Sequence, residues 1–324
     1  MNIVVTGANG FIGSFLVEAL VGQGYRVRCF VLRGEPVDAL HGLPVEIVYG
    51  DVCSRETLGD AVKDVDYVYH LAGIKTVWDE QTYFRVNFQG TRNVLEAARQ
   101  ASARLKRFVY VSSQAAAGPS WDGHPLTEEE ACHPVTAYGR SKRAAETYLL
   151  SQAQQVPITI VRPTLVYGPR NLETAMLYTM VRWRLLPLIR REQYLNLIHV
   201  RDAVRGILLA AQHEQACGQI YFITSEQAYT WREIGQRAFH LSRTRGIVLP
   251  VPWVGVKVAA GVIKSYRRFR GQPVHLIDDK VRELSQRYWV CSGQKARREL
   301  GFEPQISLDD GIRETLQWFE ERRR

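Results

Sequence analysis

Residues 1–13 narrow the choice of fold more than any other part of the chain. The apolar run Asn2–Thr6 leads directly into Gly-Ala-Asn-Gly-Phe-Ile-Gly at residues 7–13, and a helical pattern continues from Phe11 to Val21. A strand, a glycine-rich turn and a helix in this order begin a βαβ unit. The free N–H groups and the dipole at the start of such a helix favour a bound phosphate. The sequence therefore predicts an α/β fold that opens with an anion site.

Strand-like and helix-like segments alternate through the first half of the chain. Strands are expected at residues 27–32, 45–49, 67–71, 108–111 and 158–161. Helices are expected at residues 54–62, capped by Ser54, and at 91–101 and 138–150. Strands that alternate with helices of this length imply right-handed crossovers and a parallel sheet. We therefore predict a Rossmann fold, which is a doubly wound parallel sheet with helices on both faces.

The pattern changes after Arg170. The segments expected beyond it are a helix at 172–185, a strand at 197–200, a helix at 202–211 and a strand at 220–223. The last three are expected to return to the sheet. We predict a Rossmann domain for dinucleotide binding from residues 1–170 and 197–225. Residues 171–196 and 226–324 are expected to form a smaller, discontinuous C-terminal substrate domain.

Each glycine of the opening turn has its own physical task. Gly7 permits the tight turn, Gly10 lets a pyrophosphate approach the backbone, and Gly13 lets the helix pack close to the strand. With the backbone of Phe11 and Ile12, these glycines form the predicted cradle for the pyrophosphate of a dinucleotide. A glycine-rich turn without a ligand is the alternative, and the strand before it and the helix after it argue against that alternative.

The end of the second predicted strand bears on the choice of dinucleotide. An acidic residue there binds the ribose 2′-hydroxyl of NAD, whereas an arginine accommodates the 2′-phosphate of NADP. The sequence at residues 30–34 is Phe-Val-Leu-Arg-Gly, with no acidic residue. Arg33 therefore favours NADP, and NAD remains the alternative.

Two further strand ends are expected to contact the same cofactor. Asp51, followed by Val52, comes after the third strand and is placed to accept a hydrogen bond from the adenine amine. Leu71, Ala72 and Gly73 end the fourth strand with mostly small residues. Small residues let the backbone lie against the cofactor, so all five positions are predicted cofactor contacts.

A phenol and an ammonium lie four residues apart at Tyr138 and Lys142, and on a helix they share one face. A nearby ammonium favours the phenolate and lowers the pKa of a tyrosine, which lets it exchange protons with a substrate oxygen. Ser113 follows the strand at 108–111, at the edge of the sheet where ligands bind. We predict that these three residues are catalytic. An inert helix is the alternative interpretation.

These motifs, in this order, resemble the extended short-chain dehydrogenase/reductases, also called the NAD-dependent epimerase/dehydratase family. The motifs are Thr-Gly-x-x-Gly-Phe-Ile-Gly from Thr6, Gly50-Asp-Val, His70-Leu-Ala-Gly, Val86-Asn-Phe-Gln-Gly-Thr, Ser112-Ser, Tyr138-x-x-x-Lys, Arg162-Pro-x-x-x-Tyr-Gly-Pro and His199-Val-Arg-Asp. The resemblance covers nearly the whole chain. It is strongest toward hydroxysteroid-dehydrogenase-like and dihydroflavonol-reductase-like members.

The resemblance implies roles for individual residues. It implies a Ser113–Tyr138–Lys142 triad in which Tyr138 and Lys142 also contact the cofactor, and Lys142 binds the nicotinamide ribose. Asn87 and the backbone around Pro163 and Leu165 are further cofactor contacts by the same resemblance. Members of this family often pair through helices that include the tyrosine helix, so a homodimer is expected.

The residues around the triad bear on the type of reaction. Dehydratases of this family carry Asp-Glu directly after the catalytic hydroxyl, whereas this chain has Gln114 and Ala115, which cannot supply an acid and a base. Nucleotide-sugar enzymes usually place an arginine on the pyrophosphate at the position of Leu195. Arg190 or Arg191 could replace that arginine, so the nucleotide-sugar alternative is weakened but stays open.

We predict an NAD(P)-dependent oxidoreductase that interconverts a secondary alcohol and a ketone on a non-nucleotide, partly apolar small molecule. Ser113, Gln114 and Tyr138 are the expected substrate contacts. One alternative is a nucleotide-sugar epimerase that retains NAD. An alternative of another class is a scaffold that senses a dinucleotide without catalysis, which would have no need of the triad.

The formal net charge of +9 is concentrated in one segment. Residues 226–301 contain 15 Lys and Arg against 6 Asp and Glu, and the rest of the chain sums to about zero. Residues 253–270 predict a basic amphipathic helix with Lys257, Lys264 and Arg268 on one stripe. Such a helix can cap an apolar substrate or touch anionic lipid. We favour a surface helix that packs on its own domain, expect no nucleic acid, and do not favour peripheral membrane contact.

The remaining composition excludes several classes of protein. The cysteines are 5 in number and have no paired spacing, which argues against a disulfide framework and a metal site. No apolar run approaches the ~20 residues of a membrane helix, and no basic region precedes the first apolar run, as a signal peptide would require. A cytoplasmic enzyme is therefore expected.

Overall fold

The computed structural model describes residues 1–171 and 174–323. Its centre is a seven-stranded sheet in the order β10-β6-β5-β4-β1-β2-β3. Every neighbouring pair in this sheet is parallel. The strands are β1 (Asn2–Thr6), β2 (Arg26–Val31), β3 (Glu46–Tyr49), β4 (Tyr67–His70), β5 (Arg107–Val111), β6 (Ile158–Pro163) and β10 (Ile220–Ile223). The predicted Rossmann fold is confirmed.

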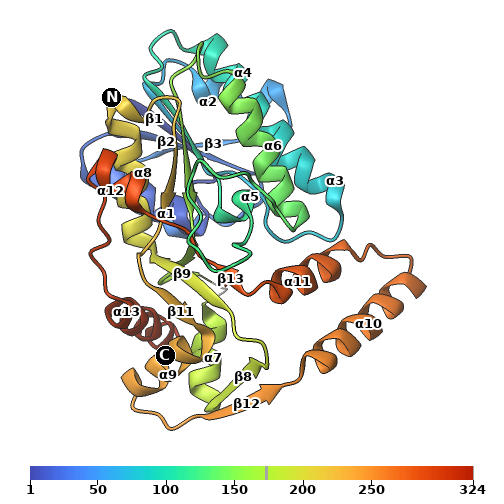
Figure 1. The fold of residues 1–324 in the computed structure, drawn as a ribbon. Coiled ribbons are helices and arrows are strands. Elements are labelled where there is room, and N and C mark those ends of the chain that lie inside the picture. The colour runs from blue at the N-terminus through green and yellow to red at the C-terminus, as the bar shows by residue number, and fades with distance from the viewer. Residues whose placement is uncertain (172–173, 324) are drawn as a thin grey trace.

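Helices cover both faces of this sheet (Figure 1). The helices on one face are α1 (Phe11–Gly22), α8 (Val200–Gln212) and α12 (Gln294–Leu300), and they share one apolar core with the strands. The helices on the other face are α2 (Gly59–Val62), α4 (Thr91–Ala101) and α6 (Ala137–Ser151), and they form a second core. Strands covered on both faces are mainly apolar, and β5 is buried at every residue and apolar from Phe108 to Val111.

A smaller lobe lies below the carboxyl ends of the strands in Figure 1. Its strands are β7 (Leu165–Tyr167), β8 (Leu185–Ile189), β9 (Tyr194–His199), β11 (Ala228–Thr230), β12 (Ile247–Val251) and β13 (Tyr288–Trp289). β9 pairs with β7, β11 and β13, and β8 pairs with β12. The helices α7 (Ala175–Trp183), α9 (Trp231–Leu241) and α13 (Leu308–Glu321) complete its core. Because separate chain segments build it, the smaller lobe is discontinuous, and the exact domain boundaries stay a prediction.

The remaining elements are short or lie beside these two lobes. They are α3 (Glu80–Tyr83), α5 (Gln114–Ala117), α10 (Trp253–Phe269), α11 (His275–Ser285), the 3₁₀ turns Asp38–Leu40, Arg55–Thr57 and Glu214–Ala216, and the π-helical turns Phe84–Gly90. None of the helices in the described part of the chain has the length and apolar character needed to span a bilayer.

Three local predictions are wrong in their extent. In place of one helix over 54–62, the chain forms a 3₁₀ turn and then α2, and the Ser54 side chain makes no capping bond. The Thr57 hydroxyl donates instead to the carbonyls of Ser54 and Asp51, which competes with helix hydrogen bonding. The first two residues of the helix expected at 172–185 lie outside the described residues. Helix α7 spans Ala175–Trp183 and ends there because Arg184 adopts a left-handed conformation. The strand expected at 197–200 is β9, which begins at Tyr194. It does not return to the large sheet as expected, because it pairs with β7, β11 and β13 in the smaller lobe.

Helix α10 packs on α11 of its own domain and does not reach the core of the smaller lobe. It projects with α11 from the side of the molecule (Figure 1), and none of its residues is buried. Val254, Val258 and Val262, which a helix packed on the core would bury, are exposed here. The amphipathic pattern is therefore real, but its apolar side faces outward.

Candidate active site

A cleft of about 530 Å³ opens at the carboxyl ends of the parallel strands. The turn after β1 and the loops after β4, β5 and β6 line it from the large sheet, and β9, α11 and β13 line it from the smaller lobe. Ligands of open α/β sheets bind at this edge, at the point where the strand order reverses. In this sheet the order reverses at β1, where β4 and β2 lie on opposite sides.

The glycine turn has the close contacts that its sequence predicts. Gly7 has a φ of +67°, and a Cβ on it would lie 2.8 Å from the backbone nitrogen of Ala72. A Cβ on Gly13 would lie 2.1 Å from the carbonyl oxygen of Gly7, so α1 could not approach β1 as closely with any larger residue. The Gly10 N–H donates to the same carbonyl at 3.1 Å, which closes the turn.

This turn fits the pyrophosphate of a dinucleotide. Gly10 is the N-cap of α1, no side chain caps the helix, and its first turn contains no acidic residue. The first N–H groups of α1 are therefore directed at the cleft without a competing carboxylate. Gly7, Gly10, Phe11, Ile12 and Gly13 all line the cleft, so the structure brings the predicted cradle together.

The residues predicted for the adenosine end lie outside the main cleft. Arg33 follows β2, is exposed, and has its guanidinium 5.9 Å from the centre of the Tyr49 ring. Asp51 accepts a hydrogen bond from the backbone N–H of Cys53 at 2.8 Å, which leaves its other carboxylate oxygen for a ligand. The Val52 side chain is buried in the core beside Gly90, so only its backbone could contact the cofactor.

The loop after β4 is held by a side chain behind the cleft. Leu71 and Gly73 line the cleft, whereas Ala72 donates its N–H to the Thr6 hydroxyl. The buried Asn87 accepts from the Ile74 N–H at 2.7 Å and donates to the Ile74 carbonyl at 3.0 Å. The structure therefore places Asn87 as a support for this loop, without a position in the cleft lining.

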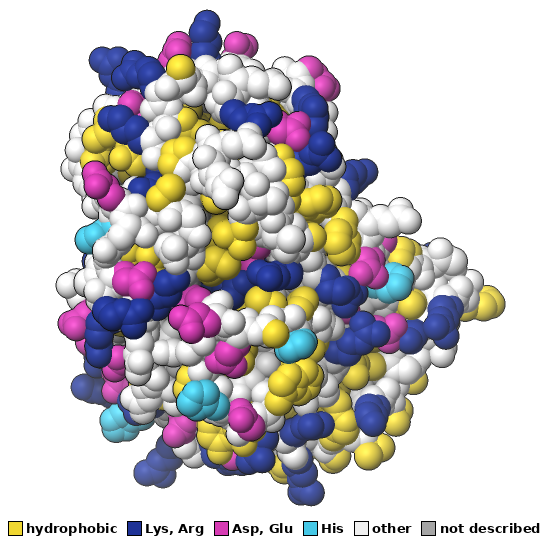
Figure 2. Space-filling model, turned by 45° about the horizontal axis from the view of Figure 1, so that its top comes forward, with side chains coloured by type: hydrophobic (Ala, Val, Ile, Leu, Met, Phe, Trp, Pro, Cys, Tyr) yellow, Lys and Arg dark blue, Asp and Glu magenta, His cyan; other side chains and the backbone are white. Residues whose placement is uncertain are grey.

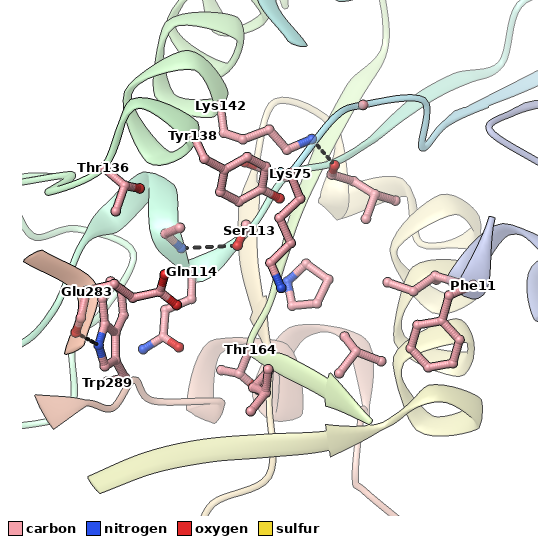
Figure 3. Close-up of a pocket in the computed structure, with 18 of the residues that line it drawn as sticks. Phe11, Lys75, Ser113, Gln114, Thr136, Tyr138, Lys142, Thr164, Glu283 and Trp289 are labelled. Carbon is pink, nitrogen blue, oxygen red and sulfur yellow. Dashed lines mark hydrogen bonds between the residues drawn. The ribbon is translucent and has the colours of Figure 1, made fainter. Parts of the chain in front are cut away.

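Ser113 and Tyr138 enter the cleft from two neighbouring helix starts (Figure 3). Ser113 is the N-cap of α5, and its hydroxyl oxygen accepts from the Ala115 N–H at 3.1 Å. The hydroxyl hydrogen can then donate to a ligand. Tyr138 lies in the first turn of α6, where Thr136 caps the helix by accepting from the Gly139 N–H, and its ring packs edge-on against Tyr83.

Lys142 lies one turn further along α6 and is buried. Its ammonium donates to the Val111 carbonyl at 2.8 Å and lies 4.5 Å from the centre of the Tyr110 ring. Burial lowers the pKa of Lys142 to about 7, and the negative charge of Glu146 opposes this effect. The lysine therefore changes its charge near neutral pH, in contact with the same cleft as Tyr138.

Several lining residues have no local signal in the sequence. Helix α11 supplies Lys280 and Glu283, and β13 supplies Trp289, whose indole N–H donates to the Glu283 carbonyl at 3.4 Å (Figure 3). These residues lie far along the chain from the triad, so only the fold brings them together. Lys75 also extends into the cleft, and its position two residues after Gly73, in the loop that follows the fourth strand, could have revealed it.

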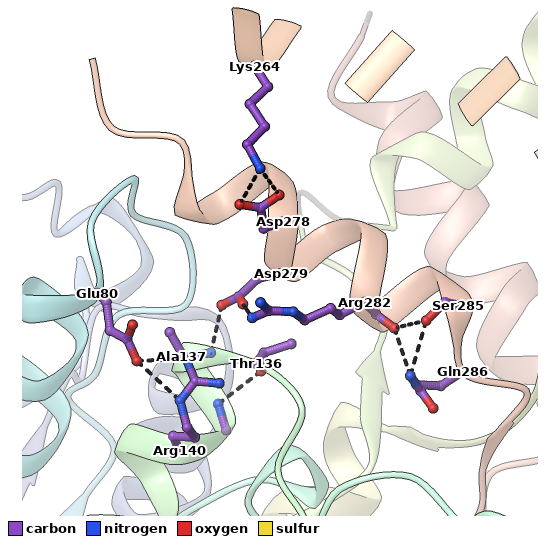
Figure 4. Close-up of polar contacts among 11 residues, drawn as sticks. Glu80, Thr136, Ala137, Arg140, Lys264, Asp278, Asp279, Arg282, Ser285 and Gln286 are labelled. Carbon is purple, nitrogen blue, oxygen red and sulfur yellow. Dashed lines mark hydrogen bonds and ion pairs between the residues drawn. The ribbon is translucent and has the colours of Figure 1, made fainter. Parts of the chain in front are cut away.

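Helix α11 also fixes the start of the tyrosine helix. The buried Asp279 carboxylate accepts from the Ala137 N–H at 2.6 Å, next to Tyr138 (Figure 4). Ala137 is the first residue of α6, so its N–H has no acceptor within the helix. Asp279 on α11 therefore fixes the start of α6 at the cleft together with the N-cap residue Thr136.

Comparison with known proteins identifies the family. The family model described as "NAD dependent epimerase/dehydratase family" matches residues 3–224. The chain belongs to the NAD-dependent epimerase/dehydratase family. It is 31% identical to a ceramide reductase of Caulobacter vibrioides, covering 98% of this chain and 94% of that protein. It is 32% identical to a putative dihydroflavonol 4-reductase of Synechocystis, with the same coverage.

Solved structures of other family members share the fold. A UDP-glucose 4-epimerase of Thermus thermophilus in complex with NAD superposes with a TM-score of 0.80, over 99% of both chains at 23% identity. The resemblance seen in the sequence is confirmed, including the similarity to dihydroflavonol-reductase-like members. The chain is an enzyme of the extended short-chain type, which argues against the scaffold alternative.

A second cavity lies on the substrate side of the cleft. Its volume is about 840 Å³, and Lys75, Leu165, Gln193 and Trp231 line both it and the first cleft, so the two spaces adjoin. Most of its remaining wall is apolar. The wall includes Met176, Leu177, Met180, Leu186, Leu188, Ile189, Ile234, Leu308 and Ile312.

Proposed function

We propose that the protein is an NADP-preferring ketoreductase that interconverts a ketone and a secondary alcohol on an apolar substrate without a nucleotide. The observation that carries this proposal is the position of Ser113, Tyr138 and Lys142 in a cleft that adjoins a largely apolar cavity. A bound nicotinamide dinucleotide would supply the hydride for reduction or accept it in the reverse direction.

Each residue of the triad has a task that its contacts support. Ser113 donates its hydroxyl hydrogen to the carbonyl oxygen of the ketone, because its own oxygen already accepts from the Ala115 N–H. Tyr138 transfers its phenolic proton to the same oxygen as hydride reaches the carbonyl carbon, which gives the neutral alcohol. Lys142, in its charged form, stabilises the phenolate that remains and provides donors for the ribose hydroxyls.

Pro163 and Leu165 border the cleft at the end of β6 and the start of β7, opposite the triad. The family resemblance implies that their backbone faces the nicotinamide ring, and their position in the cleft lining supports this assignment. Gln114 follows Ser113, and its side-chain nitrogen is buried without a partner among the described residues. A buried amide donor without a partner costs free energy, so a polar group of the substrate is a natural acceptor for it.

The apolar character of the substrate rests on the walls of the two spaces. Leu195 on β9 is in the lining of the first cleft, where an arginine would clamp a sugar nucleotide. The apolar cavity next to it offers room for the rest of a hydrophobic molecule. The related ceramide reductase is named for a lipid substrate, which supports an apolar substrate here.

A nucleotide-sugar epimerase with retained NAD is the second candidate. Arg190 and Arg191 line the larger cavity and could bind a diphosphate, which favours this candidate. Turnover with free cofactor separates the two. We expect the protein to oxidise added NADPH in the presence of apolar ketones. Purification with bound NAD, combined with activity on nucleotide sugars without added cofactor, would overturn the ketoreductase proposal.

The preference for NADP can be tested at Arg33. We expect Arg33→Ala to weaken the binding of NADPH by about 10- to 100-fold and to leave NADH binding nearly unchanged, since only NADPH carries the 2′-phosphate. Fluorescence of the bound reduced nicotinamide measures both affinities, and Arg26→Ala, at the opposite end of β2 from Arg33, is the control. Equal loss of both cofactors, or tighter binding of NADH than NADPH by the parent, contradicts the assignment.

A further inference from the structure

The side of α10 that faces away from the protein is apolar, whereas an ordinary surface helix turns its apolar side toward the protein. Val254, Val258 and Val262 are 69%, 59% and 65% exposed, and Phe269 near the end of the helix is 89% exposed. Residues at positions i, i+4 and i+8 lie along one stripe of a helix, so these three valines share a stripe. Phe269 continues the same stripe near the end of the helix. The inward side carries the half-buried Lys264 and Arg267.

Basic side chains border this apolar stripe. The exposed residues Lys257 and Arg268 lie along one edge of the apolar stripe, about a quarter of a helical turn around the axis. Arg270, just after the helix, lies on the other side of the stripe. Between Glu233 and Asp278 the sequence has 8 Lys and Arg residues and no Asp or Glu. Figure 2 shows hydrophobic and basic side chains mixed on the part of the molecule that projects to the right. The surface around α10 is therefore apolar and positively charged.

The inward side of α10 is anchored to the neighbouring helix. The Lys264 ammonium binds both carboxylate oxygens of Asp278 on α11, at 2.6 and 2.8 Å (Figure 4). The Arg267 guanidinium lies over the Trp78 ring, 3.3 Å from its centre. These contacts hold the helix in a fixed orientation while its apolar stripe faces away from the part of the protein that the structure describes.

We propose that α10 is a membrane-docking helix that lies in the interface of an anionic bilayer. Such helices insert an apolar stripe among the acyl chains and place lysine and arginine at the level of the headgroups. The basic side chains beside the apolar stripe decide between two possible partners of this surface, a second copy of α10 and a membrane. A second copy of α10 would bring the same positive charges together, whereas anionic lipid offers both negative charge and an apolar interior.

The docking helix is joined to the substrate side of the cleft. Trp253, the first residue of α10, lies under the guanidinium of Arg191, which lines the apolar cavity. Strand β12 leads into α10 and pairs with β8, whose residues form one wall of the same cavity. If the proposed function holds, an apolar ketone could move from the bilayer into this cavity. That link rests on the proposed function, whereas docking itself does not.

Co-flotation of the purified protein with lipid vesicles tests the proposal without any turnover. We expect the protein to float with vesicles of phosphatidylcholine and phosphatidylglycerol, and to bind much less to phosphatidylcholine alone or in high salt. Val258→Asp/Val262→Asp should reduce binding by roughly tenfold or more, whereas Val258→Leu/Val262→Leu should retain it. Neither pair touches the catalytic cleft, so ketone reduction in solution should continue in both.

Two double variants with the same change in net charge test the role of the basic side chains beside the apolar stripe. Lys257→Glu/Arg268→Glu should abolish the preference for anionic vesicles, whereas Arg26→Glu/Lys63→Glu, on the Rossmann domain, changes the net charge equally and should keep it. Failure of the parent to bind any vesicle, or equal binding by the two valine pairs, overturns the proposal. Chromatography that shows a dimer broken by the aspartates, without vesicle binding, assigns the stripe to self-association. A parent that docks but reduces no ketone would refute only the proposed function.

Discussion

Tyr138→Phe is expected to lower the turnover number by about 10³-fold, because the substrate oxygen loses its proton donor in the cleft. Phenylalanine keeps the ring that packs against Tyr83, so folding and dinucleotide binding should stay close to those of the parent. Steady-state kinetics give the turnover number, and fluorescence titration with reduced cofactor gives the affinity. The expected pattern is a large loss of turnover with little change in cofactor affinity.

A tyrosine on the same helix provides the control. The Tyr148 hydroxyl donates to Glu96, away from the cleft, so Tyr148→Phe makes the same chemical change on α6 without a catalytic consequence. We expect it to retain nearly full turnover. Comparable activity in Tyr138→Phe and in the parent would mean that another group supplies the proton, and the assignment of the triad would be wrong.

Lys142→Met is expected to lower turnover by about 100-fold or more, because the cleft loses the positive charge beside the phenol and the donor for the ribose. Methionine fills a similar buried volume, so the variant should fold. Unlike Tyr138→Phe, this variant should also bind the dinucleotide more weakly. Weak binding together with slow turnover distinguishes the lysine from a residue that serves only in proton transfer.

The same variant has a predicted dependence on pH. The folded lysine loses its proton near pH 7 and the unfolded one near 10.5, so the unfolded state binds more protons between these values. Stability of the parent should therefore rise with pH, relative to Lys142→Met, by about 1 kcal/mol per pH unit between about pH 8 and pH 10. Urea unfolding of the cofactor-free proteins measures this, with Lys63→Met as the exposed control. If the stability of the parent and that of Lys142→Met changed with pH in the same way, Lys142 would not be buried as described.

The sheet and the cradle were predictable because local sequence determines them. Strands buried on both faces are mainly apolar, as β5 is from Phe108 to Val111, and only glycine fits where Gly13 approaches the Gly7 carbonyl. These constraints act within a few residues of the chain. The order of the motifs then located Ser113, Tyr138 and Lys142 in the cleft lining, where the structure places all three.

The substrate side could not be predicted in the same way. Asp279 caps the tyrosine helix from 142 residues further along the chain, and no local pattern signals such a contact. The position of Asn87 was also not predictable from its motif. The motif indicates a cofactor contact, whereas the hydrogen bonds of Asn87 hold the loop at Ile74. For α10 the periodicity predicts an amphipathic helix, but periodicity does not say which side faces the protein.

Transfer of isotope from labelled cofactor into product tests the proposed reaction most directly. The purified protein is incubated with an apolar ketone and free NADPH that carries deuterium at the transferable position of the nicotinamide. We predict an alcohol with one deuterium on its carbinol carbon, formed in step with the oxidation of NADPH and almost absent with Tyr138→Phe. Product without deuterium, or interconversion of epimers on protein-bound NAD while free NADPH stays unconsumed, would contradict the account.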